Sequence, residues 1–194
     1  MSTGIIILSA GNSSRLGNPK QLLYYKGSTL LETTISAAEQ TSFAPVVLVL
    51  GAYATEILAA NPNLNINYII NESWEQGISS SIAAGLTKII ELDPDTQNVI
   101  IAVSDQPFIS HEIFEALLEK QRSTAKPMIA SQYSETIGTP ALFNRQYFDP
   151  LMSLEGNMGA KHILTENIDE VATVPFELGR IDIDNETDYN NLSK

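Results

Sequence analysis

The chain has 194 residues, of which 43% are hydrophobic and 18% are charged, so it is long and apolar enough to bury the core of one domain. Its formal net charge of −12 argues against duplex nucleic acid or an anionic membrane as partner, because both repel an acidic surface. The lack of cysteine excludes disulfides, thiolate metal sites and a cysteine nucleophile.

The N-terminal region carries an apolar run, Gly4 to Leu8, with no basic region before it. This run is too short for the hydrophobic part of a signal peptide, and no stretch approaches the ~20 apolar residues of a membrane span. The two histidines, His111 and His162, are too far apart in sequence to suggest a histidine-rich zinc site. We therefore expect one cytoplasmic domain over residues 1–194.

Strand-like and helix-like segments alternate along the chain. Short apolar runs predict strands that are buried on both faces. Helices are indicated by one apolar face, and by capping signals such as Thr29 to Glu32, which has the spacing of a capping box. In chain order we expect a strand at 4–9, a helix at 29–40, a strand at 46–50, a helix at 55–60, a strand at 66–70, a helix at 80–91, a strand at 99–103, a helix capped by Ser110 and ending near 122, strands at 128–130 and 141–143, a helix at 157–165 and a strand at 171–175.

This alternation predicts an α/β domain with three layers, α/β/α, around a mainly parallel sheet. In such sheets, ligands bind in the crevice outside the carboxyl ends of the strands. The residues that follow Ser9, Ile70 and Val103 are therefore the first candidates for a functional site.

The segment after the first strand, 8–23, reads LSAGNSSRLGNPKQLL. Gly11 and Gly17 permit backbone conformations and close approaches that a side chain would block. Backbone N–H groups of such a loop can wrap the oxygens of a triphosphate, while Arg15 and Lys20 offset its charge. The P-loop pattern does not fit, because five residues rather than four separate the two glycines. A surface turn with solvated cations is the alternative interpretation.

Asp105 follows the predicted strand at 99–103, within the run Val-Ser-Asp-Gln-Pro. A carboxylate in this place can hold a hard cation such as Mg²⁺ in the crevice. An aspartate after a strand is also a frequent turn former or helix cap, so its position alone leaves both interpretations open.

Two further segments carry polar groups in suggestive positions. Ser79–Ser81 place hydroxyl and backbone N–H groups at the start of a predicted helix, which suits an anion, while plain N-capping is the alternative. Asp182 and Asp184 alternate along an expected extended strand, so their side chains would share one side. Such a pair suits a metal ion, and a solvated acidic tail is the alternative.

Together these segments resemble the molybdenum-cofactor nucleotidyltransferases, which are MobA-like NTP transferases. The first loop of that family reads roughly L-A-A-G-x-S-x-R-M-G-x-x-K-x-L-L, and Ser9 and Leu16 are the departures here. Asp105-Gln106-Pro107 is similar to the metal-binding motif of the cytidylyl-type members, with Ser104 in place of their glycine. Segments 71–81, 138–143, 154–161 and 182–189 are similar to N-x-x-W-x-x-G-M-x-x-S, G-x-P-x-L-F, L-x-G-D-x-G-A-R and D-I-D-T-P-E-D-L.

Two departures in the 154–161 segment bear on function. Asn157 replaces the family's aspartate, and Lys161 replaces its arginine. An asparagine cannot carry a negative charge, but it caps a helix as well as an aspartate does. We therefore expect Asn157 to cap the helix that follows it.

The resemblance implies a Rossmann-like, GT-A-like nucleotidyltransferase fold and a Mg²⁺-dependent reaction. It implies transfer of a nucleoside monophosphate, with CTP favoured as donor, onto molybdopterin cofactor with release of pyrophosphate. Arg15, Lys20 and Asp105 are implied as catalytic residues, and Asp105 with Asp182 or Asp184 as metal ligands. The implied nucleotide-binding residues are Ser9, Ala10, Gly11, Asn12, Ser13, Ser14, Arg15, Lys20, Asn71, Gly77, Ser79, Ser80 and Ser81.

Three alternatives stay open at this point. A guanylyltransferase, or a sugar- or alcohol-phosphate nucleotidyltransferase of the same fold, relies on the same physical chemistry. The third is a non-catalytic protein that delivers cofactor to a molybdenum-enzyme partner, which the loss of the acidic group at Asn157 favours. The cations Arg15 and Lys20 and the carboxylate of Asp105 argue for catalysis instead.

Overall fold

The computed structural model describes residues 2–13, 16–183 and 186–192. Its strands are β1 (Thr3–Ser9), β2 (Tyr24–Tyr25), β3 (Ser28–Thr29), β4 (Val46–Leu50), β5 (Asn67–Ile70), β6 (Asn98–Val103), β7 (Met128–Tyr133), β8 (Thr136–Asn144) and β9 (Val171–Pro175). Its α-helices are α1 (Leu30–Glu39), α2 (Ala54–Ala60), α3 (Ile78–Leu92), α4 (His111–Thr124), α5 (Phe148–Met152), α6 (Ala160–Glu166) and α7 (Glu186–Leu192).

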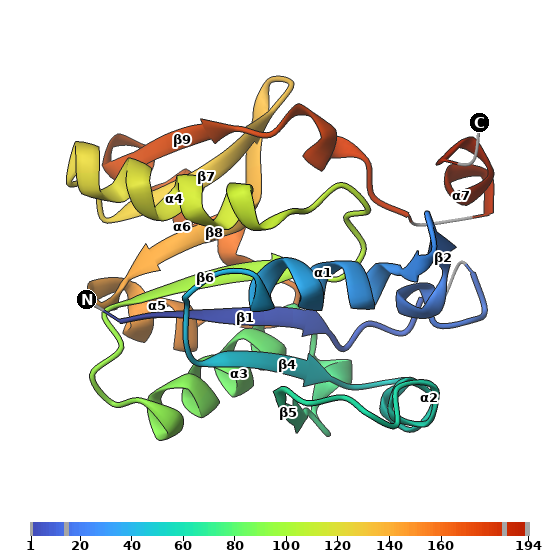
Figure 1. Ribbon diagram of the computed structural model, residues 1–194. Coiled ribbons are helices and arrows are strands. Elements are labelled where there is room, and N and C mark those ends of the chain that lie inside the picture. The colour runs from blue at the N-terminus through green and yellow to red at the C-terminus, as the bar shows by residue number, and fades with distance from the viewer. Residues whose placement is uncertain (1, 14–15, 184–185, 193–194) are drawn as a thin grey trace.

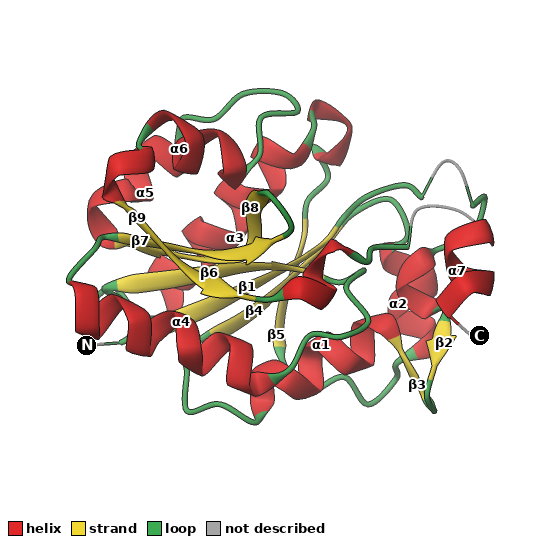
Figure 2. Cartoon of the chain, turned by 90° about the horizontal axis from the view of Figure 1, so that it is seen from above, coloured by secondary structure: helices red, strands yellow, loops and turns green. Residues whose placement is uncertain are grey.

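A seven-stranded sheet in the order β5-β4-β1-β6-β8-β7-β9 forms the centre of the fold, with helices on both of its faces (Figures 1 and 2). Strand β1 pairs in parallel with β4 and β6, β4 pairs in parallel with β5, and β7 pairs in parallel with β9. Only β8, within this sheet, runs antiparallel to both of its neighbours. The predicted three-layer α/β domain with a mainly parallel sheet is confirmed.

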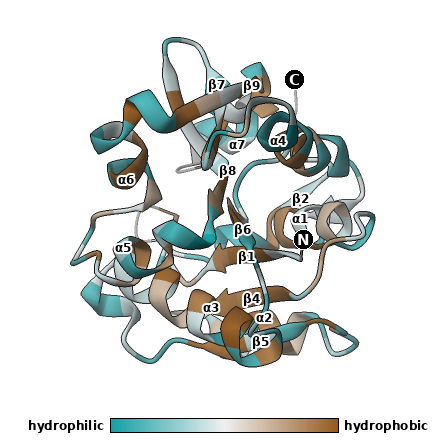
Figure 3. Ribbon diagram, turned by 90° about the vertical axis from the view of Figure 1, so that its left-hand side faces the viewer, coloured by the Kyte–Doolittle hydropathy of each residue, from teal (hydrophilic) through white to brown (hydrophobic). Residues whose placement is uncertain are grey.

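The two faces of the sheet bury two separate apolar clusters. Ile5 and Ile7 of β1 point into the cluster that packs under α1 and α4. Ile6 and Leu8 point to the other face, where α3, α5 and α6 cover the sheet. Because successive side chains of a strand face opposite ways, burial on both faces requires an uninterrupted apolar run. Figure 3 shows this hydrophobic colouring on the central strands β1, β4 and β6.

The capping signals predicted for α1 and α4 have different outcomes in the structure. The predicted capping box of α1 is present: the Glu32 backbone N–H donates to the Thr29 hydroxyl at 3.1 Å, and the Thr29 N–H donates to the Glu32 carboxylate at 2.7 Å. Ser110 occupies the N-cap position of α4, but its side chain makes no capping hydrogen bond, so that prediction is wrong in part. The nearby Ser110 side chain is instead the largest cause of the lowered pKa of the exposed Glu112 carboxyl group.

The β7–β8 hairpin is longer than its apolar runs suggest. The predicted strands at 128–130 and 141–143 are only its apolar halves. Beyond them, residues such as Gln132 and Thr136 continue the ladder through backbone pairing, which no side-chain pattern reveals. The expected extended strand around Asp182 is absent, because residues 181–183 form irregular backbone.

No helix of the described part of the chain combines the length and the apolar character needed to cross a lipid bilayer.

Gly85 allows α3 to approach the sheet closely. A Cβ at this position would come within 2.6 Å of a methyl group of Ile6 and 2.9 Å of one of Val49. We therefore expect Gly85→Val to lower the free energy of unfolding by about 1–3 kcal/mol, the usual cost of overpacking a core. Urea denaturation measures the change. Thr87→Val, on the exposed side of the same helix, is the control and should shift stability by no more than about 0.5 kcal/mol.

Candidate active site

A cavity of about 370 Å³ lies at the carboxyl ends of β1 and β6. It is lined by three regions of the chain and by one separate residue. The end of β1 and the first loop contribute Leu8, Ser9, Ala10, Gly11, Asn12, Lys20 and Gln21. The segment before and at the start of α3 contributes Trp74, Glu75, Gly77, Ile78 and Ser81. The end of β6 contributes Val103, Ser104 and Asp105, and the separate residue is Asn157. The cavity therefore forms where doubly wound sheets bind their ligands.

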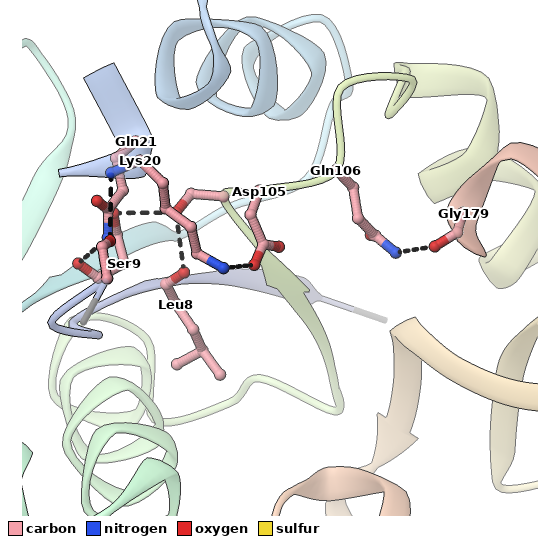
Figure 4. A network of polar contacts seen from close by, with 9 residues as sticks. Leu8, Ser9, Lys20, Gln21, Asp105, Gln106 and Gly179 are labelled. Carbon is pink, nitrogen blue, oxygen red and sulfur yellow. Dashed lines mark hydrogen bonds and ion pairs between the residues drawn. The ribbon is translucent and has the colours of Figure 1, made fainter. Parts of the chain in front are cut away.

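Lys20 and Asp105 meet across this cavity. The Lys20 ammonium lies 2.6 Å from a carboxylate oxygen of Asp105, and their side chains are 17% and 18% exposed (Figure 4). Lys20 begins the short 3-10 helix η1 (Lys20–Leu22), while Asp105 follows β6. The parallel pairing of β1 with β6 brings these two distant parts of the chain to one edge of the sheet.

Ser9 and Ser104, two of the departures from the family pattern, bond to each other. The Ser104 hydroxyl lies 3.0 Å from the Ser9 hydroxyl and 3.2 Å from the Leu8 carbonyl oxygen, to which it donates. Both serines are buried, with 2% and 3% of their surface exposed. Because buried hydroxyls need partners, each serine satisfies a polar group that the other introduces. The Ser9 hydroxyl thus helps to hold β1 and the loop after β6 together in the wall of the cavity.

Ser13 and Gly17 give the first loop its shape. The backbone N–H groups of Leu16 and Gly17 donate to the Ser13 carbonyl, and the Lys20 N–H donates to the Ser13 hydroxyl at 3.2 Å. Gly17 has φ +67°, a left-handed conformation that glycine adopts at little cost. Ser13 thereby fixes the backbone of Lys20. The predicted residues Ser14 and Arg15 lie outside the described part of the chain.

The 71–81 segment uses most of its polar groups internally. The Asn71 amide donates to the hydroxyls of Ser80 at 2.9 Å and Ser81 at 3.0 Å. Ser79 donates its hydroxyl to the Gly156 carbonyl at 2.8 Å. Of the predicted residues in this segment, Gly77 and Ser81 line the cavity, whereas Asn71, Ser79 and Ser80 support its wall.

Asn157 belongs to the cavity and not to a helix cap. Helix α6 has Gly159 at its N-cap position and no capping side chain, so the prediction that Asn157 caps it is wrong. Two bonds from α3 hold the preceding residue: Ser79 donates both its N–H and its hydroxyl to the Gly156 carbonyl. This docking turns Asn157 toward the cavity. Sequence reasoning also missed Gln21, Trp74 and Glu75 as lining residues, although all three lie inside the quoted motifs.

Asp182 lies in irregular backbone and is not among the residues that line the cavity, but it shares a neighbour with Asp105. The pKa of the half-buried Tyr133 phenol is raised, first by burial and then by the negative charges of Asp182 and Asp105. Both carboxylates therefore act on the same hydroxyl group. Asp184 lies outside the described residues, among which no cluster of three acidic or histidine side chains is found.

The donor groups fit a magnesium ion better than a zinc ion. Mg²⁺ is usually held by one or two carboxylates together with substrate phosphates, so a full cage of protein ligands is not required. The carboxylate oxygens of Asp105, in the cavity, are donors of that kind.

The pattern of the MobA-like NTP transferase domain matches residues 5–171. The chain belongs to this nucleotidyltransferase family. Among curated proteins it is similar to the nicotine blue oxidoreductase of Paenarthrobacter nicotinovorans, with 32% identity over 143 residues. That match covers 72% of this chain and 66% of the relative, so the chain spans just under two thirds of it.

Solved structures of the same fold include Rv0371c from Mycobacterium tuberculosis H37Rv, with 26% identity, a TM-score of 0.85 and coverage of 99% of this chain and 98% of the other. A complex of Rv0371c with manganese superposes with a TM-score of 0.82, at 23% identity and coverage of 99% and 98%. A CMP:2-keto-3-deoxy-manno-octonic acid synthetase complexed with CTP has a TM-score of 0.77 at 14% identity, covering 99% and 97%. The last two likenesses, below 25% identity, show the fold alone.

Gly77 joins the two walls of the cavity. Its φ of +102° and ψ of 179° lie in a region that essentially only glycine occupies, and a Cβ there would strike the Gly156 carbonyl. We expect Gly77→Ala to push the 154–159 turn away from α3, lower the melting temperature and weaken nucleotide binding. Thermal denaturation with and without NTP measures both effects.

Gly156→Ala is the matched control, because Gly156 also has a positive φ, +57°, but a Cβ there meets no atom within 4 Å. It should carry only the strain of a left-handed residue, about 1–2 kcal/mol. Equal losses in the two variants would contradict the importance of the contact between Gly77 and Gly156.

Proposed function

We propose that this protein transfers CMP from CTP to molybdopterin cofactor and releases pyrophosphate, in a reaction that depends on Mg²⁺. The observation that carries the proposal is the contact between Lys20 and Asp105 in the strand-end cavity. A cation and a carboxylate in one cleft provide complementary partners for a metal–triphosphate complex. Membership of the MobA-like family supports the reaction class.

The Lys20–Asp105 ion pair is exchanged for ligand contacts when substrate binds. The Lys20 ammonium group then contacts oxygens of the triphosphate instead of Asp105. There it stabilises the negative charge on the α-phosphate and on the departing pyrophosphate. Asp105, with Asp182 as a second ligand, is then available to hold Mg²⁺. The metal supplies charge neutralisation along the triphosphate. The loop from Ala10 to Lys20 wraps the phosphates with its backbone N–H groups, and we assign Arg15 to the same charge-stabilising role.

The acceptor needs no strong general base. A terminal phosphate oxygen of the acceptor is already anionic, so it attacks the α-phosphorus in line. The new P–O bond forms as the bond to the β-phosphate oxygen breaks, and pyrophosphate takes the electron pair of that bond. Positioning and electrostatic stabilisation account for the acceleration. This chemistry is consistent with a cavity that is lined by Lys20 and Asp105.

The preference for CTP rests on motif similarity. Asp105-Gln106-Pro107 and Ala10-Gly11 are similar to the cytidylyl-type members of the family. Pyrophosphate release from purified protein with each of the four NTPs, with and without intact molybdopterin cofactor, tests the proposal. We expect release with CTP that depends on the cofactor. A higher rate with GTP points to a guanylyltransferase, and tight binding without turnover points to a cofactor-delivery protein.

Lys20→Ala should reduce turnover by ~100-fold or more, the scale for losing one charge contact in the transition state. The same pyrophosphate assay under saturating CTP measures the loss. Lys88→Ala is the control, because Lys88 pairs with Glu91 on the surface of α3. If Lys20→Ala keeps the wild-type rate, Lys20 is a surface cation without a role in transfer.

Asp105→Asn should raise the Mg²⁺ concentration needed for half-maximal turnover, because an amide oxygen binds a hard cation more weakly than a carboxylate does. Mg²⁺ titrations of the variant and the wild type at fixed CTP give this comparison. Superimposable titration curves would remove Asp105 from the metal site.

A further inference from the structure

Gln106, the residue after Asp105, is buried and holds two other segments through its amide. Only 3% of its surface is exposed. Its Nε2 donates to the carbonyl oxygen of Thr139 at 3.1 Å. It also donates to that of Gly179 at 2.8 Å, the bond that Figure 4 shows. Thr139 belongs to β8, and Gly179 belongs to the 3-10 helix η5 (Glu177–Arg180). One side chain thus joins the loop after β6 to strand β8 and to the 3-10 helix η5.

The orientation of this amide is fixed by its two acceptors. With nitrogen and oxygen exchanged, the Gln106 Oε1 would face two carbonyl oxygens, and no hydrogen would lie between them. In the observed orientation Oε1 is buried without a hydrogen-bond partner among the described residues. An unsatisfied buried acceptor is costly, at about 1–3 kcal/mol. The contacts of Nε2 are therefore better explained by what they position than by stability alone.

The segment that Gln106 anchors through Gly179 leads directly to Asp182. Gly179 precedes Asp182 by only three residues, which can span at most about 11 Å of extended chain. Gly179 is itself fixed, because its N–H donates to the Phe176 carbonyl at 2.8 Å and a Cβ would meet the Phe176 ring at 2.5 Å. Anchoring Gly179 beside Gln106 therefore limits how far Asp182 can lie from the loop of Asp105. The shared influence of Asp182 and Asp105 on Tyr133 agrees with that placement.

We propose that Gln106 is a positioning residue, which holds the segment of Asp182 against the loop of Asp105 so that both carboxylates serve one metal–nucleotide site. The inference rests on the proposed function only in assigning a metal to Asp105. It gives Gln106 a role of its own: it sets the separation of the two ligand-bearing segments and does not touch the nucleotide.

The first test is Gln106→Met, which keeps the length and volume of the side chain and removes both N–H donors. Mn²⁺ binding in the presence of CTP, followed by electron paramagnetic resonance, is the readout and needs no turnover. We expect the Kd for Mn²⁺ to rise about tenfold, the scale for losing a residue that orients a metal ligand. Gln121→Met is the matched control: the Gln121 amide donates to Asn98 at 2.7 Å, at the opposite end of β6, so its loss should leave Mn²⁺ binding unchanged.

A double-mutant cycle with Asp182→Asn distinguishes positioning from general loosening of the fold. If Gln106 acts through Asp182, Gln106→Met should change Mn²⁺ affinity less than about twofold once Asp182 is already replaced. A tenfold loss in both backgrounds, or no loss in the wild-type background, overturns the proposal. If Gln106→Met does not fold, Gln106→Asn replaces it; the shortened amide keeps at most one of the two bonds and should give a smaller loss of the same sign.

The wild-type protein separates this inference from the proposed function. Mn²⁺–CTP binding that depends on Gln106, together with no pyrophosphate release from any NTP, supports the positioning role and rejects the transferase proposal. Pyrophosphate release, together with a Mn²⁺ affinity that Gln106→Met does not change, supports the transferase proposal and rejects the positioning role of Gln106.

Discussion

The parallel pairing of β1 with β6 is the constraint on which the candidate site depends. Leu8 pairs with Val103, so the chain leaves both strands at the same edge and at the same level. The loops that follow these two strand ends carry Lys20 and Asp105, whose charged groups lie 2.6 Å apart. A slip of one residue in this register would turn every side chain of a strand to the other face, and both apolar clusters would be lost with the site. The burial of the sheet thereby protects the geometry of the cavity.

Directional hydrogen bonds hold other segments at or next to the cavity. The Gly156 carbonyl accepts two bonds from Ser79, and the Gln106 amide donates to Thr139 and Gly179. Such contacts fix position within a narrow range, whereas apolar packing mainly fixes volume and burial. The cavity thus combines one wall set by the register of the sheet with others set by a few buried polar groups. Single substitutions at those groups should affect the geometry of the site more than the stability of the fold.

Departures from a family pattern are easier to interpret in pairs than singly. Ser9 and Ser104 each replace a smaller residue, and their buried hydroxyls lie 3.0 Å apart. Without Ser104, the buried hydroxyl of Ser9 would need another partner, which is costly, whereas Ser104 also donates to the Leu8 carbonyl. Asn157 is different, because it faces the cavity and its replacement of an acidic residue changes the charge there. The first change preserves the wall of the site, and the second alters what the site offers to a ligand.

The sequence by itself determined the layers of the fold and the segments that meet at the site. Some signals extend over only a few residues, such as the apolar run 46–50 and the capping box that begins at Thr29. They can be interpreted without knowing which other segments pack against them. Only the tertiary structure decided that Lys20 contacts Asp105, that Gln106 bonds Gly179, and that Asn157 lines a cavity instead of capping α6. These contacts depend on strand order, on register and on hydrogen bonds between distant segments. No local pattern of side chains encodes them.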